Sequence, residues 1–400
     1  MIMMKSMGTA MVVGASLVAA ALGADWPQFR GPAGDGTSQE KGWVKNGAVA
    51  RTVWEGQVGA GYSAVAIKGG RLYTMGNRSG MDVVVCLDAV KGTNLWEYAY
   101  PCPAGSYPGP RCTPTVEGDS VYTISREGVV LCLDAGKGTV RWQCNLAKEI
   151  GLKVPGWGLS SSPLVVGNLV IVNAGARGVA VDKATGLVKW SSGAGGSGYA
   201  SPVLFKQGRV TAVLVFAARG IEAVEAATGK ELWSHAWKTG YDVNAADPLV
   251  IGDKVLISSG YDKGAALLSP TGTACKVEWE NKNLASHFSS AVLWRSLVYG
   301  NSGNVGRGAE LRCLDPATGA IRWSHKETGF GSLILADGKL IVLGERGVLS
   351  VAEASPEGYR ELWSQKVIDG TCWTMPTLCN GLIYCRNDKG RLVCLDLSGK

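Results

Sequence analysis

Short runs of apolar and β-branched residues, each about as long as one strand, recur along the chain. They occupy residues 71–75, 121–124, 169–172, 255–258, 340–343 and 382–385. Runs of this length, bounded by glycine-rich turns, are typical of β-strands and too short for ordinary helices. Several units also contain an earlier run that opens at a proline, at Pro114, Pro163, Pro202, Pro248 and Pro376. Proline is tolerated at the first residue of a strand, so the pattern predicts an almost entirely β chain.

A segment of the form Cys-Leu-Asp-Ala-x-x-Gly-x-x-x-Trp follows these runs and repeats along the chain. The clearest copies begin at Cys86, Cys132 and Cys313, and weaker or stretched copies lie between Cys132 and Cys313 and after Cys313. The last copy begins at Cys394 and reaches the end of the sequence before any tryptophan, whereas Trp54 has no such segment before it. If the chain closes head to tail, eight tryptophans share one position: Trp54, Trp96, Trp142, Trp190, Trp233, Trp279, Trp323 and Trp363.

These tryptophans recur about every 44 residues, which is the size of one four-stranded propeller blade. The spacing predicts an all-β fold, an eight-bladed β-propeller of four-stranded antiparallel blades, in which an N-terminal strand around Trp54 completes the C-terminal blade. Such radial stacking buries the faces of sheets that would be exposed alone. We interpret the repeating tryptophan as a packing wedge between blades, because its period is that of the architecture. The repeating aspartate is predicted to accept hydrogen bonds from backbone N–H groups of the turn.

Composition agrees with a turn-rich β protein and excludes several other classes. Glycine makes up 56 of 400 residues, hydrophobic residues 46% and charged residues 18%. A disordered chain needs lower hydrophobicity and higher charge, collagen needs a three-residue glycine period, and glycine weakens helix interiors. The formal charge is +7, without any run of five lysines or arginines. We therefore expect no nucleic-acid partner.

The N-terminus has the features of a secretory signal over residues 1–24. Lys5 precedes an apolar run over residues 11–22, and Gly23 and Ala24 are small residues suited to cleavage. The alternative, a membrane anchor, needs nearly 20 unbroken apolar residues, and glycine, serine and threonine interrupt this stretch. We expect an N-terminal arm at residues 25–50, a propeller at 51–400 and a periplasmic or secreted monomer. We also expect neither a lipid anchor nor a membrane span.

The cysteine count of 11 is odd, so not every thiol can pair within the chain. Four cysteines share the repeat position and are expected to be small core residues: Cys86, Cys132, Cys313 and Cys394. Cys102 and Cys112 flank a loop rich in proline and glycine. They are the pair best placed for a local disulfide, and free thiols are the alternative.

The repeat resembles that of the PQQ-like (pyrroloquinoline-quinone-type) propeller family over residues 51–400. Residues Asp25-Trp26-Pro27-Gln28-Phe29-Arg30-Gly31-Pro32 also resemble the start of mature exported members. The resemblance implies one of three classes: quinoprotein dehydrogenases, outer-membrane-assembly scaffold lipoproteins, or propellers of other roles. The chain lacks the adjacent cysteine pair and haem motif found in many of the dehydrogenases, and the lipidated N-terminal cysteine of the scaffolds. Fold alone does not choose among these functions.

The segments leading into the first strand of each blade are expected to meet at one mouth of the central channel. Aligned three residues before the proline or its equivalent, they give a ring of Gly61, Arg111, Ser160, Tyr199, Ala245, Phe288, Phe330 and Trp373. Asn244 and His287 lie one position earlier, and Asp247 directly precedes Pro248. The predicted ligand-binding residues are Arg111, Tyr199, Asn244, Asp247, His287 and Trp373, which suit a planar or anionic ligand. The alternative is that these residues only close the channel.

We predict a non-catalytic binding or scaffold module for an envelope protein partner or a small ligand, with no cofactor and no metal. The competing hypothesis is an oxidoreductase of the alcohol or sugar dehydrogenase type that depends on PQQ and Ca²⁺. In that case Asn244 and Asp247 would supply oxygen ligands to the calcium ion. Asp247 would also be the candidate general base.

Overall fold

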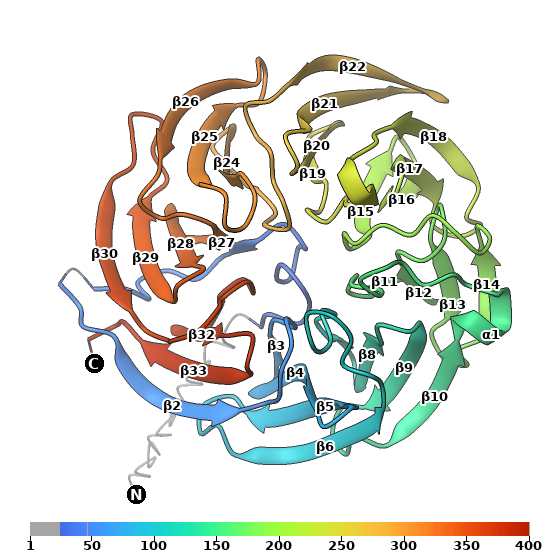
Figure 1. Ribbon diagram of the computed structural model, residues 1–400, viewed down its shortest axis with the longest axis horizontal. Helices are drawn as coiled ribbons and strands as arrows, with labels where there is room; N and C mark the ends of the chain where they lie inside the picture. The colour runs from blue at the N-terminus through green and yellow to red at the C-terminus, as the bar shows by residue number, and fades with distance from the viewer. Residues whose placement is uncertain (1–24, 46, 400) are drawn as a thin grey trace, which may run out of the picture.

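The computed structural model describes residues 25–45 and 47–399, so the predicted signal at residues 1–24 lies outside the described residues. The chain forms eight antiparallel sheets of four strands arranged around a central axis (Figure 1), and one sheet gains a fifth strand. The prediction of an all-β, eight-bladed propeller is confirmed. No helix within the described residues is long and apolar enough to cross a membrane.

The first four blades follow one another along the chain. Blade 1 contains β3 (Ala66–Lys68), β4 (Arg71–Arg78), β5 (Met81–Asp88) and β6 (Asn94–Pro101). Blade 2 contains β7 (Thr115–Glu117), β8 (Ser120–Ile124), β9 (Val129–Asp134) and β10 (Val140–Asn145), followed by the short helix α1 (Leu146–Ile150). Blade 3 contains β11 (Leu164–Val166), β12 (Leu169–Val172), β13 (Val179–Asp182) and β14 (Val188–Ser191). Blade 4 contains β15 (Val203–Gln207), β16 (Val210–Ala217), β17 (Gly220–Glu225) and β18 (Glu231–Ala236).

The second half of the ring continues in the same way, after a 3-10 turn at η1 (Gly240–Asp242). Blade 5 contains β19 (Leu249–Ile251), β20 (Lys254–Ser259), β21 (Gly264–Thr271) and β22 (Ala274–Asn281). Blade 6 contains β23 (Val292–Trp294), β24 (Leu297–Ser302), β25 (Glu310–Asp315) and β26 (Ala320–His325). Blade 7 contains β27 (Gly331–Ala336), β28 (Lys339–Gly344), β29 (Val348–Glu353) and β30 (Glu361–Lys366), with β1 (Thr37–Ser38) added. Blade 8 contains β31 (Thr377–Cys379), β32 (Leu382–Arg386), β33 (Arg391–Asp396) and β2 (Arg51–Gln57).

Blade 8 closes the ring by joining the two ends of the propeller. Its outermost strand, β2, pairs antiparallel with β33 and places Trp54 opposite Cys394. The same cross-strand row appears in blade 1, where Trp96 lies opposite Cys86. The N-terminal strand therefore takes the position that the repeat left empty at the C-terminus, as predicted.

The repeating tryptophans pack between neighbouring blades, which confirms their structural role. The Trp54 Nε1 group donates a hydrogen bond of 2.9 Å to the Ala89 carbonyl in the turn of the next blade. Its ring lies against that turn so closely that a Cβ added to Gly92 would lie 2.5 Å from the indole. Six of the eight indoles donate to a carbonyl of the next blade. The repeating aspartate shapes the same turn, because Asp88 Oδ1 accepts the N–H groups of Val90 and Lys91.

The N-terminal arm appears in blue across the ring in Figure 1 and contacts the innermost strands of several blades. Trp26 exchanges two backbone hydrogen bonds with Ile67, and Pro27 accepts the N–H of Val116. Further along the arm, β1 pairs parallel with the end of β27. The repeat does not predict this strand or its path, because the arm lies outside the periodic part of the chain.

The predicted disulfide between Cys102 and Cys112 is not formed in the structure. Both thiols are free and about 1% exposed, within one hydrophobic cluster. Cys112 Sγ instead accepts the N–H of Ile124 at 3.4 Å, as a small core residue would. The four cysteines of the repeat are also buried, as expected.

Candidate functional site

The segments leading into the innermost strands converge around a cavity of about 460 Å³ at one end of the channel. All eight blades contribute to its wall. Phe29 and Arg30 of the N-terminal arm also line it, and the Arg30 side chain is only 2% exposed, so the arm closes this end of the cavity to solvent. Its size is within the roughly 300–1,000 Å³ typical of small-molecule sites.

The upper wall is built from one equivalent position in successive blades, three residues before the proline position. Six of the eight predicted ring residues line the cavity, and the two exceptions are Gly61, where Tyr62 lines it instead, and Phe330, which packs against Phe288. In blade 1 Ala66 pairs with Tyr73, and the corresponding pair in blade 2 is Thr115 with Tyr122. Tyr62 and Arg111 each lie four residues before the first member of the pair, so these two residues are equivalent. The prediction was wrong by one residue because blade 1 has no proline to mark the start of its first strand.

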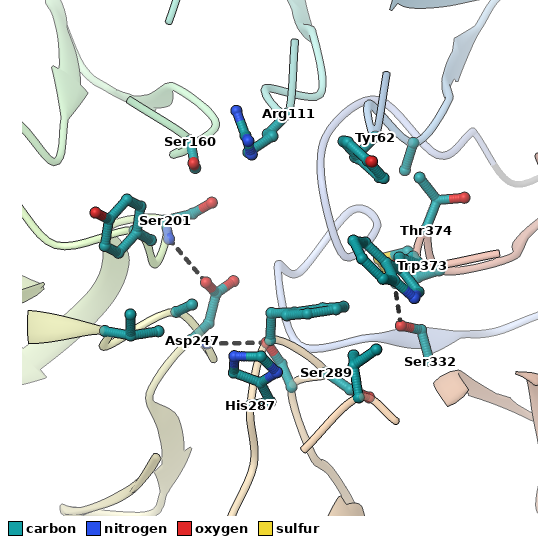
Figure 2. A pocket seen from close by; sticks show the side chains of 18 of the residues that line it. Tyr62, Arg111, Ser160, Ser201, Asp247, His287, Ser289, Ser332, Trp373 and Thr374 are labelled. Atoms are coloured by element: carbon teal, nitrogen blue, oxygen red, sulfur yellow. Dashed lines mark hydrogen bonds between the residues drawn. The ribbon is translucent and has the colours of Figure 1, made fainter. Parts of the chain in front are cut away.

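A second ring, two residues further on, links the blades by hydrogen bonds. The Ala64 N–H donates to Thr113 Oγ1, and the Thr113 N–H donates to Ser162 Oγ. The series of hydrogen bonds continues from Ser162 to Ser201 and on to Asp247, whose Oδ1 accepts the Ser201 N–H at 2.7 Å. Asp247 thus occupies a position where neighbouring blades carry a serine or threonine (Figure 2). Its backbone N–H in turn donates to Ser290 Oγ.

Aromatic side chains surround the cavity above these hydroxyls. Tyr62 stacks on Trp373 with ring centroids 5.3 Å apart, and Phe288 packs against the same indole at 5.4 Å. On the other side of Phe288, the His287 ring contacts both it and Tyr261. We call this series of rings the aromatic collar; it consists of Tyr62, Trp373, Phe288, His287, Tyr261, Tyr241, Trp157 and Tyr199.

The collar continues through Tyr241 and Trp157, which are outside the predicted ring, to Tyr199, which belongs to it. Tyr261 contacts Tyr241, which contacts Trp157, and Trp157 contacts Tyr199, each pair with centroids 5.5–6.3 Å apart. Tyr241 has a left-handed backbone with φ of 64° and is 75% exposed. Most adjacent rings are tilted or edge-to-face, whereas Tyr62 and Trp373 are stacked.

Arg111 lies between the two ends of the collar. Its guanidinium carbon is 5.7 Å from the Tyr62 ring centroid, within the range of a cation–π contact. Its Nη2 group makes only long contacts, 3.3 and 3.4 Å, to the carbonyls of Tyr107 and Ser106, and its buried Nη1 has no partner among the described residues. Burial, together with the nearby Arg126, lowers the pKa of Arg111 to about 10. It therefore remains a cation at neutral pH with a hydrogen-bond donor to spare.

Asp247 and Arg30 meet at the closed end of the cavity. Asp247 Oδ2 lies 3.9 Å from Arg30 Nε, which is too long for a hydrogen bond, and the two side chains are 3% and 2% exposed. Burial raises the pKa of Asp247 to about 6, against the opposing effect of Arg30. Arg30 also donates from Nη2 to the Ala291 carbonyl at 2.7 Å, which ties the arm to blade 6.

His287 lies across the cavity from Arg111 (Figure 2). Its Nε2 is 3.2 Å from the Tyr261 hydroxyl, and its buried Nδ1 has no hydrogen-bond partner in the part of the chain described. Burial lowers the pKa of His287 to about 4, so the ring is neutral at neutral pH. The unprotonated nitrogen of a neutral imidazole can accept a hydrogen bond from a ligand.

Asn244, by contrast, does not line the cavity. It is fully buried, and its Nδ2 group donates to the Ala217 carbonyl at 2.8 Å while Oδ1 accepts from Ser259 Oγ at 2.7 Å. These bonds hold the segment that leads into blade 5. Residues 25–45 and 47–399 contain no group of three or more His, Cys, Asp or Glu side chains arranged to hold a metal ion.

The structure therefore brings five of the six predicted ligand-binding residues to one cavity: Arg111, Tyr199, Asp247, His287 and Trp373. Their role in binding stays a prediction. Reasoning from the repeat missed Tyr62, because of the shifted alignment, and the floor residues Phe29 and Arg30. The signal for the floor was present in the Trp-Pro-Gln-Phe-Arg-Gly-Pro stretch, whose unusual composition has no counterpart in the repeat.

Comparison with known proteins identifies the chain's relatives. The family model described as outer membrane protein assembly factor BamB matches residues 40–151, 107–325 and 307–400. Among solved structures, BamB from Moraxella catarrhalis is similar, with a TM-score of 0.66 and 19% identity over 87% of this chain and 98% of that one. The quinohemoprotein alcohol dehydrogenase from Comamonas testosteroni has a TM-score of 0.71 and 15% identity over 94% and 81% of the two chains. A europium-containing methanol dehydrogenase gives 0.70 and 14% over 92% and 89%. No curated protein matches the chain in sequence.

Proposed function

Because the chain belongs to the PQQ-like propeller family represented by the BamB model, we propose that it is a non-catalytic binding module. Its blind cavity takes a small organic anion, which enters at the mouth framed by the aromatic collar. The solved relatives share less than 20% identity with this chain and indicate only the fold. We therefore infer the function from the cavity's own side chains.

The observation that carries this proposal is the free donor on Arg111. A buried guanidinium nitrogen without a hydrogen-bond partner, such as Nη1 of Arg111, is costly unless a ligand completes it. The other cationic side chains on the wall are Arg30 and Arg307, whereas Asp247 is the only carboxylate that lines the cavity in the described structure. The excess of positive charge favours an anion, and the collar supplies apolar surface for its body.

A quinoprotein oxidoreductase is the second candidate, favoured by the planar Trp373 ring near Arg111. PQQ would supply a quinone that accepts electrons from an alcohol or sugar, in these enzymes together with Ca²⁺. The residues expected to hold calcium do not fit that ion. The Asn244 amide is fully used by protein groups, and the Asp247 carboxylate faces the Arg30 cation. We therefore derive no catalytic step through this cofactor.

A protein partner at the cavity mouth is the other form that a binding module could take. The family's description as an assembly factor supports a protein partner, and Tyr107 and Tyr241 at the rim are 52% and 75% exposed. We favour the small anion because the unpartnered Arg111 nitrogen is buried inside the cavity and not displayed at the rim. In bacteria, export to the periplasm follows from the predicted signal at residues 1–24.

Isothermal titration calorimetry on the purified chain tests the proposal with benzoate, D-glucuronate and PQQ, the last with and without CaCl₂. We expect at least one anion to bind, and Arg111→Gln to weaken it about tenfold or more, since a hydrogen bond to a charged group contributes roughly 1.5–3 kcal/mol. Arg322→Gln is the matched control, because Arg322 pairs with Asp315 on the surface. If none of the anions binds, the proposal is wrong. Calcium-dependent PQQ binding with dye-linked alcohol oxidation would instead establish the oxidoreductase.

A further inference from the structure

Hydroxyl groups form a second layer of the cavity wall below the aromatic collar. Six serines and one threonine line the cavity. Ser162 and Ser201 accept backbone N–H groups from the preceding blade through Oγ. Because a serine hydroxyl also carries a proton, each retains a donor in addition to the bond it accepts. The layer thus offers several O–H donors close together.

Two further hydroxyls have no protein partner at all. Ser289 Oγ and Ser160 Oγ are buried and make no hydrogen bond to any described residue. Ser289 is only 1% exposed and lines the cavity beside His287 (Figure 2). Ser160 lies across the cavity, next to Arg111. Buried polar groups without partners are rare in native proteins, and both of these serines line the cavity.

The same wall also contains acceptors that require donors from the ligand. His287 Nδ1 has no partner within the described chain, and burial lowers the pKa of the ring so that it is neutral. In the tautomer that donates from Nε2 to the Tyr261 hydroxyl, Nδ1 is a free acceptor. Asp247 Oδ2 is not hydrogen-bonded to Arg30 at 3.9 Å, although Oδ1 accepts the Ser201 N–H. A ligand group beside this carboxylate must donate a hydrogen bond or be positively charged, because a second carboxylate there would be repelled.

A ligand that satisfies this wall must both donate and accept hydrogen bonds at several points and carry an anionic group near Arg111. Flat aromatic acids supply acceptors but few donors, and inorganic anions leave the collar unused. Polyhydroxylated acids meet both requirements, because their hydroxyls donate and accept while the C–H faces of a sugar ring pack on aromatic rings. We propose that the ligand of this cavity is a sugar acid, that is, a monosaccharide carrying one carboxylate. This inference rests on the proposed anion-binding function.

The test compares three probes in calorimetry: D-glucuronate, D-glucose, which lacks the carboxylate, and benzoate, which lacks the hydroxyls. We expect glucuronate to bind at least tenfold more tightly than either of the others. Ser289→Ala should weaken glucuronate about fivefold or more and leave benzoate unchanged, whereas Arg111→Gln should weaken both acids. Ser324→Ala, at an exposed serine on β26, is the matched control. Thermal unfolding of each variant identifies any that does not fold, and Ser160→Ala then replaces Ser289→Ala.

The outcomes distinguish failure of the sugar-acid inference from failure of the anion-binding function. If benzoate binds as tightly as glucuronate, or if Ser289→Ala and Ser160→Ala leave glucuronate affinity unchanged, the sugar-acid inference is overturned and the anion-binding function stands. If glucose binds as tightly as glucuronate, both are overturned. If none of the three binds, the sugar-acid inference is overturned, and the anion-binding function is overturned as well when PQQ also fails to bind. Tight glucuronate binding that depends on Arg111 and on the serine hydroxyls supports both.

Discussion

The guanidinium of Arg30 and the carboxylate of Asp247 face each other at the closed end of the propeller channel, 3.9 Å apart and almost fully excluded from water. One belongs to the N-terminal arm and the other to the segment that leads into blade 5. Because Arg30 also donates to the Ala291 carbonyl of blade 6, a single arm residue joins the arm to the opposite side of the ring. The floor of the cavity and the stability of the propeller therefore depend on the same contact.

Removing one partner of this pair should destabilise the whole fold. Arg30→Gln leaves the Asp247 carboxylate buried without its counterion, and a broken buried pair costs about 3–5 kcal/mol. We expect a loss of that order in the free energy of unfolding measured by urea denaturation. Arg51→Gln is the matched control, because Arg51 is 63% exposed where it pairs with Asp396, and such pairs contribute at most about 1 kcal/mol. Equal losses from both substitutions would contradict a structural role for the buried pair.

The pH dependence of stability should carry the signature of Asp247. Its pKa is raised by burial to about 6 in the folded protein, against an ordinary value of about 4 in the unfolded chain. Between these values the folded state holds a proton that the unfolded state has lost, so this group makes the free energy of unfolding decrease as the pH rises. Its contribution amounts to roughly 3 kcal/mol between pH 4 and pH 6.

Denaturation curves at half-unit pH intervals, for the natural chain and for Asp247→Asn, measure this contribution as a difference. Asparagine keeps an oxygen to accept the Ser201 N–H but cannot ionise. The difference between the two chains should change with pH between 4 and 6 and be constant above pH 7. A difference that is constant across the whole range would show that Asp247 titrates at its ordinary pKa.

Substitutions at two turn glycines can separate the contribution of tryptophan packing to stability from the cost of backbone strain. Gly92 and Gly272 both have positive φ, 69° and 66°, but only at Gly92 would an added Cβ meet an indole, 2.5 Å away, whereas at Gly272 it would meet nothing within 4 Å. Gly272→Ala should therefore cost about 1–2 kcal/mol from backbone strain alone. Gly92→Ala should cost several kcal/mol more, because the Trp54 ring must move. Equal costs in urea denaturation would show that the wedge is not tightly packed.

The thiols should be free and unreactive in the folded protein. Burial raises the pKa of Cys102 and Cys112 to about 12, so neither forms the reactive thiolate at neutral pH. We expect slow alkylation by iodoacetamide in the native state, and alkylation of all 11 cysteines after unfolding without reductant. Mass spectrometry counts the added groups. A pair of cysteines that is alkylated only after reduction would restore the disulfide that the structure lacks.

The propeller could be predicted from the sequence because its information is local and periodic. The aspartate, glycine and tryptophan of each unit shape one turn and one interface, and eight copies make the register visible. The regularity weakens at Trp233. The turn of the next blade, around Gly272, is stretched, and Trp233 Nε1 has no hydrogen-bond partner in the described residues. Even there the blade persists, because the other strands of the unit define it.

The candidate site could be predicted only in part, because its position depends on contacts between distant segments. Arg111 and Trp373 were found by their place in the repeat, whereas Tyr62 was displaced by one residue where no proline marks the strand. Arg30 meets Asp247 across more than two hundred residues, and nothing in the spacing of either residue indicates the other. Asn244 illustrates the converse: its type suggested a ligand, but its amide is required to satisfy backbone groups.

Trp373 tests whether the collar contributes to binding separately from Arg111. Its indole stacks on Tyr62, and its Nε1 donates to Glu345 Oε1 at 2.8 Å, so the ring is fixed in place before any ligand arrives. Trp373→Leu removes the ring face and keeps an apolar side chain. We expect a loss of about five- to tenfold in affinity for D-glucuronate, in line with an aromatic contact contributing roughly 1 kcal/mol or more.

Trp294→Leu is the matched control, because Trp294 lies at the far end of β23 and does not line the cavity. Calorimetry gives the affinities, and urea denaturation confirms that both variants are folded. If Trp373→Leu and Trp294→Leu bind equally, the collar only closes the channel and the anion is held by Arg111 and the hydroxyl layer. If Trp373→Leu alone loses affinity and its binding enthalpy becomes less favourable, the ring face is part of the ligand site, and the fixed Tyr62–Trp373 stack is preorganised for it.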